Sequence, residues 1–113
     1  MKKVLPSKKR VFTINVPIFT AGIKVFVCTV DEFRKYRPDV EDNCQGCFLP
    51  SHNWMWFNSE VEISPGLIAH ECIHAVNCIY EHKGIQITMD NDEVLAYSVE
   101  WMVDKIFKKI YIK

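Results

Sequence analysis

The chain has 113 residues, of which 49% are hydrophobic and 25% are charged, and its 14 Lys and Arg balance 14 Asp and Glu. This length allows one hydrophobic core, so we expect residues 1–113 to form a single domain. The composition excludes a disordered or fibrous chain. A net charge of zero provides no overall field to attract nucleic acid or an anionic membrane, which makes nucleic acid an unlikely partner.

The N-terminal segment 1–10 is basic and contains Pro6, and we expect it to be flexible and solvated. No apolar signal-peptide core follows this segment, and no apolar stretch is long enough to cross a bilayer. The five cysteines are an odd set without the paired spacing of a secreted disulfide framework. The sequence therefore predicts a cytoplasmic protein with free thiols and no membrane partner.

The first third of the chain predicts two strands and a short helix. Residues 11–28 are rich in Val, Ile, Phe and Thr, with turn signals at Pro17 and at 21–22, which indicates a hairpin. Thr29 is a good N-cap for a helix over 30–36, because a glutamate follows three residues later.

The rest of the chain predicts two more strands and two long helices. Residues 47–57 contain two short strands around a turn at 50–53, and Ser64 is a good N-cap for a helix over 65–82 that begins with proline and is followed by glycine. A last helix spans about 91–110. This order of elements predicts an α+β fold with a small antiparallel or mixed sheet.

The helix over 65–82 contains His70-Glu71-Cys72-Ile73-His74, an HExxH motif. Residues four apart lie on one helical face, so both imidazoles can approach one tetrahedral metal ion while Glu71 points toward a water molecule. The ion would acidify that water and Glu71 would act as general base in peptide-bond hydrolysis. Because two histidines and a glutamate are costly to bury in so apolar a segment, the context favours a Zn²⁺ site over a chance match.

A catalytic zinc ion has three protein ligands and a water. Glu93 is our expected third ligand, because its separation of 19 positions from His74 leaves room for a helix end, a short connection and a returning helix. Glu100 and the nearby Asp90 or Asp92 are the alternatives. Asp90 and Glu93 also match a capping box, which would hold the Glu93 carboxylate away from a metal ion.

With these residues the chain resembles the gluzincins, HExxH metallopeptidases whose third ligand is a glutamate on a following helix, and also small phage-encoded HExxH proteins. The resemblance implies a zincin-like fold and a peptide or protein substrate that binds as an added strand, with residues 47–57 lining the cleft. Many gluzincins have an aspartate one turn after the ligand glutamate, where this chain has Tyr97. Tyr97 is a candidate catalytic donor to the oxyanion, or Glu100 orients a histidine.

Several residues keep two interpretations. Trp54, Trp56 and Phe57 belong either to the core or to the cleft. Cys44 and Cys47, with His52, form an incomplete structural zinc motif, which needs four ligands. Cys78 is expected to be a buried core residue, and His82 to contact the last carbonyls of its helix.

Zinc-dependent peptide-bond hydrolysis is the predicted function, and the alternative is an inactive zincin-fold binding or regulatory module with a structural zinc.

Overall fold

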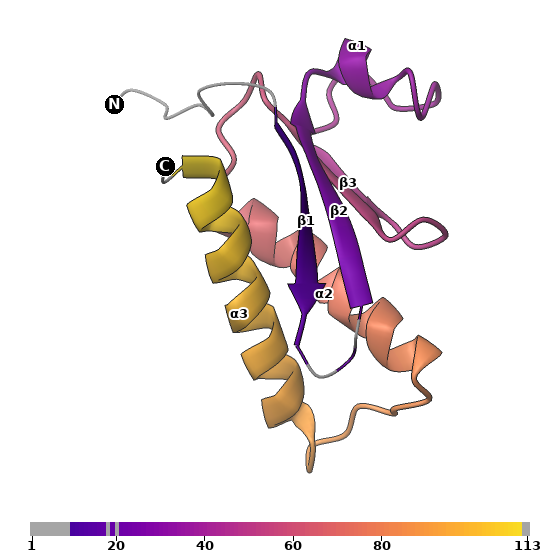
Figure 1. Cartoon of the computed structure of the whole chain (residues 1–113), viewed down its shortest axis with the longest axis vertical. Coiled ribbons are helices and arrows are strands. Elements are labelled where there is room, and N and C mark those ends of the chain that lie inside the picture. Colours follow the sequence, from indigo (N-terminus) through magenta and orange to yellow (C-terminus); the bar gives the residue numbers. More distant parts are fainter. Residues whose placement is uncertain (1–9, 18, 20, 112–113) are drawn as a thin grey trace.

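The computed structural model describes residues 10–17, 19 and 21–111 (Figure 1). The predicted flexible segment 1–10 therefore lies outside the described residues, except for Arg10, which begins the first strand. The described residues form an α+β fold, as predicted, with one mixed four-stranded sheet and two long helices. Neither long helix in the described part is apolar enough over its length to cross a membrane.

The sheet has the strand order β1-β2-β4-β3. β1 and β2 are antiparallel, β2 and β4 are parallel, and β3 and β4 are antiparallel, so β1 and β3 form the two edges of the sheet. The predicted turn at 50–53 connects β3 and β4 and is confirmed. The strand bounds are Arg10–Val16 for β1, Ala21–Cys28 for β2, Gly46–Leu49 for β3 and Trp54–Asn58 for β4.

The predicted turn at 21–22 is wrong, because Ala21 and Gly22 are the first residues of β2 and pair with Val16 and Asn15. The alternating side chains of β2, with Ile23 and Val25 buried, fix the register, and this register extends the ladder back through Gly22. Pro17 follows the last residue of β1, where its missing N–H removes no ladder hydrogen bond.

The short helix α1 covers Val30–Phe33 and is closed by the predicted capping box, in which the Thr29 side chain accepts from the Glu32 N–H and the Glu32 carboxylate accepts from the Thr29 N–H. It is shorter than the predicted 30–36, since the chain continues as turns. The Arg34 guanidinium donates to the Val40 carbonyl at 2.8 Å and folds the following loop back toward α1.

Helix α2 covers Pro65–His82 as predicted, and the Ser64 hydroxyl accepts from the Leu67 N–H at 3.1 Å. Gly84 follows the helix with φ +70°, a conformation that glycine adopts without strain. Helix α3 covers Asp92–Tyr111. Both helices pack on one face of the sheet and enclose the main core, to which α3 contributes the fully buried residues Met102, Ile106 and Ile110.

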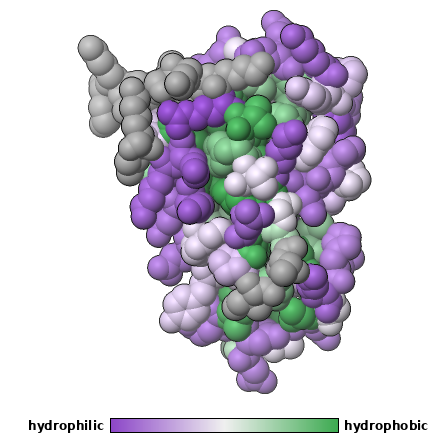
Figure 2. Space-filling view, viewed as in Figure 1, coloured by the Kyte–Doolittle hydropathy of each residue, from purple (hydrophilic) through white to green (hydrophobic). Residues whose placement is uncertain are grey.

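The opposite face of the sheet carries a smaller aromatic core beneath α1. There the Trp56 ring stacks on Phe33 with centroids 5.0 Å apart. Trp56 and Phe57 are both fully buried, so they are core residues and do not line a cleft. Figure 2 shows hydrophobic side chains in a strip down the middle of the viewed side of the molecule, with hydrophilic side chains on both flanks.

Candidate active-site cleft

The HExxH residues lie in the first half of α2, where helical periodicity sorts them by burial. His70 and His74 are exposed, while Glu71, one residue further round the helix, is only 5% exposed. The two imidazole rings have centroids 5.0 Å apart and an interplanar angle of 77°. The two histidines therefore form an accessible pair on adjacent turns of the helix, with a buried carboxylate beside them.

Burial raises the pKa of Glu71 above its ordinary value, and the nearby His70 and His74 oppose this rise. Desolvation favours the neutral carboxylic acid, whereas positive charge on either imidazole favours the carboxylate. A glutamate with a raised pKa is a better proton acceptor at neutral pH than an exposed one, as long as it stays ionised. These surroundings suit a residue that both takes up and returns a proton.

A cleft of about 440 Å³ separates α2 from the edge strand β3. The β3 side of the cleft consists of Gly46, Cys47 and Phe48, with Pro50 beyond them. These four residues therefore form one wall of the cleft, whereas the expectation that all of 47–57 would do so is too broad. The α2 side consists of Glu71, His74, Asn77, Cys78 and Glu81.

Glycine at position 46 allows β3 to approach β4 closely at this wall. A Cβ at Gly46 would lie 2.9 Å from the backbone oxygen of Trp56, which is too close for any other residue without a backbone shift. Because β3 is an edge of the sheet, its outer backbone groups face away from β4 and toward the side where an added strand can pair.

Two thiols line the cleft from opposite walls. Burial, together with the charges of Cys44 and Glu71, raises the pKa of Cys47 to about 11. Cys78 is half-buried and lines the cleft, so the prediction that it is a core residue is wrong. The physical reason is its place on the β3 side of α2, one turn after His74, away from the sheet face that buries Cys72.

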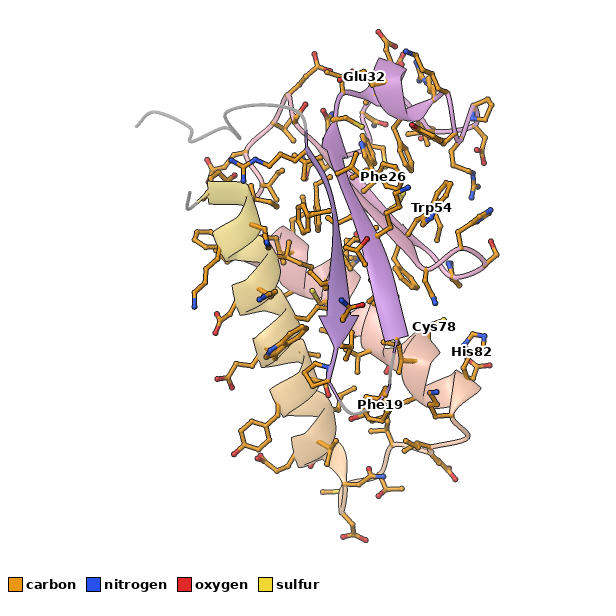
Figure 3. The ribbon with its side chains drawn as sticks, in the orientation of Figure 1. Phe19, Phe26, Glu32, Trp54, Cys78 and His82 are labelled. Carbon is orange, nitrogen blue, oxygen red and sulfur yellow. The ribbon has the colours of Figure 1, made fainter. Side chains whose placement is uncertain are left out.

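His82 makes the contact that its position predicts. Its Nδ1 lies 2.8 Å from the Cys78 carbonyl oxygen, in the last turn of α2, and 3.5 Å from the Cys78 sulfur. Figure 3 shows both residues in the C-terminal half of α2, on the side of the molecule away from α3. His52 lies in the β3–β4 turn, where its ring is 4.7 Å from the Trp54 ring.

Helix α3 packs beside β1, at the opposite edge of the sheet from β3 (Figure 1). Tyr97 is 65% exposed and lines a groove with Val16, Pro17 and Trp101, which is separate from the cleft that contains Glu71. The structure thus does not bring Tyr97 into the cleft that Glu71 and His74 line, and His70 lies outside the lining of both. Glu93 is exposed in the first turn of α3.

The predicted capping box at the start of α3 does not form. The Asp90 N–H donates to the Thr88 hydroxyl at 3.2 Å, and the Asn91 side chain accepts from the Thr88 N–H at 2.7 Å. These bonds order the turn before α3 without using the Glu93 carboxylate. Glu93 therefore has no capping role that would compete with another use of its side chain.

The described residues group two of the protein ligands that a zinc ion needs. His70 and His74 supply two accessible imidazoles, but among the residues that the structure describes no three His, Cys, Asp or Glu side chains are grouped to hold a metal ion. Neither Glu93 nor Glu100 joins the histidines, and within the same residues no third donor joins Cys44 and Cys47. The third ligand remains a prediction from sequence.

The resemblance implied that the segment beginning at Cys47 lines the cleft, but sequence reasoning did not identify Cys78 and Glu81 as cleft residues. Cys78 and Glu81 follow His74 by four and seven residues, so they lie on the same face of α2 as His74. This spacing could have predicted that both residues line the cleft. The position of Cys47 depends on which strand lies beside α2, which no local pattern gives.

Comparison of the chain with known protein families, curated proteins and solved structures finds no match.

Proposed function

We propose that this chain is a zinc-dependent peptide hydrolase of the zincin type. One observation carries the proposal: the buried Glu71 lies beside the exposed pair His70 and His74, in a cleft whose other wall is an edge strand. The five free cysteines support the cytoplasmic setting that the sequence predicts. Its substrate in this proposal is a peptide or an extended protein segment.

His70 and His74 would hold the ion through their imidazole nitrogens, with Glu93 as the proposed third ligand. For Glu93 to take part, the first turn of α3 would have to move toward the histidines, and the exposed connection before it gives room for such a movement. When bound, zinc would polarise the substrate carbonyl and make a water more acidic.

The chain's own residues would supply the proton transfers and the substrate alignment. Glu71 would accept a proton from the attacking water and return it to the leaving amine, a double role that suits a carboxylate with a raised pKa. The outer edge of β3 would pair with the backbone of an extended substrate, as exposed sheet edges do in other peptide complexes. Cys47 and Phe48 would then face the substrate side chains.

Glu71→Gln provides the decisive comparison, because it keeps the shape of the side chain but removes its basicity. The wild type and the variant are each loaded with one equivalent of zinc, and a broad peptide library is screened for new termini by mass spectrometry. We expect cleavage by the wild type and a loss of at least about 100-fold in the variant. Glu60→Gln, at an exposed glutamate outside the cleft, is the matched control. Equal cleavage by wild type and Glu71→Gln would refute the assignment.

A second candidate function is a binding module that uses the same cleft without catalysis. The observation that favours it is the lack of a third donor beside His70 and His74 in the described residues. This candidate predicts that the zinc-loaded wild type binds peptides from the library but leaves all of them intact.

A further inference from the structure

The cleft extends well beyond the HExxH residues along α2. Glu71 and Glu81 both line it, and their separation of ten positions corresponds to about 15 Å of helix at 1.5 Å per residue. An extended peptide rises by about 3.3 Å per residue, so roughly four substrate residues fit beside this length of helix. The far end of the cleft, at Glu81, therefore lies within reach of side chains two to four residues away from the bond beside Glu71.

The charge of the cleft is one-sided, although the chain as a whole is neutral. Among the residues that the structure describes, its lining includes the carboxylates of Glu71 and Glu81, the imidazole of His74 and no lysine or arginine. Glu81 is exposed, and no salt bridge to it is found in the described part of the chain. The neighbouring His82 and Lys83 line a different groove, with Phe19 and Asn53.

The position of Glu81 is unfavourable for the helix itself. It lies in the last turn of α2, where the helix dipole favours cations and disfavours a carboxylate. Its negative charge also acts inside the cleft: after burial, the Glu81 charge is the second cause that raises the pKa of the Cys78 thiol. A carboxylate that the dipole of its own helix disfavours, that has no salt bridge within the described residues and that lines a cleft is suited to a cationic ligand.

We propose that Glu81 forms a subsite for a lysine or arginine side chain, so that the cleft selects extended peptides carrying a positive charge two to four residues from the bond held beside Glu71. This inference rests on the proposed function, since it names the substrate class for the same cleft. It goes further because it assigns specificity to a residue outside the HExxH motif. An ion pair at this partly solvated position is worth about 0.2–1 kcal/mol, so the preference it creates is modest and depends on salt.

The test measures binding, which does not require turnover. Short acetylated and amidated peptides with a fluorescent label are titrated into the Glu71→Gln protein at low salt, and a single lysine is moved along an otherwise uncharged sequence. We expect the lysine peptide with the best position to bind about two- to fivefold more tightly than its glutamine counterpart. Glu81→Gln in the same background should remove this preference, and Glu81→Lys should reverse it in favour of a glutamate peptide. Glu60→Gln should keep it.

Each result bears on one proposal. Equal affinity for lysine and glutamine peptides at every position, a preference that survives Glu81→Gln, or no measurable binding of any peptide would overturn the Glu81 subsite. Library cleavage by the wild-type enzyme without a lysine preference would leave the hydrolase proposal intact. Lysine-dependent binding without cleavage by the wild type would instead support the subsite and favour the binding module.

Discussion

The imidazole rings of His70 and His74 lie 5.0 Å apart between centroids and nearly perpendicular to one another, one helical turn apart on the exposed side of α2. Their accessibility means that a metal ion can reach both nitrogens without local unfolding. The carboxylate of Glu71 is buried next to them.

The purified protein should bind about one zinc ion per chain, as a single-ion catalytic site does. His70→Ala and His74→Ala should each abolish stoichiometric binding, because each removes half of the donor set that α2 presents. Elemental analysis after gel filtration measures the stoichiometry, and His52→Ala, in an exposed turn, is the matched control. Full occupancy in both α2 variants would show that the ion is held elsewhere.

Glu93→Ala tests the third ligand. If the first turn of α3 moves to complete the site, the variant should lose on the order of 100-fold or more in zinc affinity, since even outer-shell ligand partners are worth 10–100-fold. Competition with a chromophoric chelator measures the affinity, and Glu100→Ala is titrated beside it. A larger loss in Glu100→Ala would transfer the role to that residue, and unchanged affinity in both would leave the two-histidine arrangement that the structure presents.

Ser64→Ala should destabilise the protein by about 1 kcal/mol, because the Leu67 N–H at the start of α2 would lose its 3.1 Å hydrogen bond to the Ser64 hydroxyl. Ser64→Asp should retain most of the stability, since its carboxylate can accept the same bond and suits the helix dipole. Urea unfolding of the metal-free protein gives both values. Equal stability of the alanine variant and the wild type would contradict the assigned cap.

The Cys47 thiol should alkylate slowly at neutral pH. Its pKa is raised to about 11 from 9.0, so the folded protein holds on the order of 100-fold less thiolate at this site near pH 7 than the unfolded chain. The rate of carboxamidomethylation, followed by peptide mass spectrometry with a chelator present, should keep rising beyond pH 9. The same peptide in denaturant is the control, and a plateau near pH 9 in the folded protein would contradict the raised pKa.

The features that depend on neighbours within a few residues could be predicted from the amino-acid sequence alone. The bounds of α2 follow from the Ser64 cap and the glycine at position 84, and the capping box of α1 follows from Thr29 and its glutamate three residues on. Helical periodicity is equally local, and it was enough to put His70 and His74 on one helical face. The apolar segment around them predicts that both histidines are buried, whereas the structure exposes them and, of the three motif residues, buries only Glu71.

The residues that face helix α2 depend instead on tertiary packing. The parallel pairing of β2 with β4 puts β4 in the middle of the sheet and leaves β3 at the edge, so Cys47 comes to line the cleft opposite Cys78 and Glu81. The same packing puts α3 beside β1, away from that edge. Strand partners and helix positions are chosen by burial of apolar surface between residues distant in sequence, a contribution that no local spacing records.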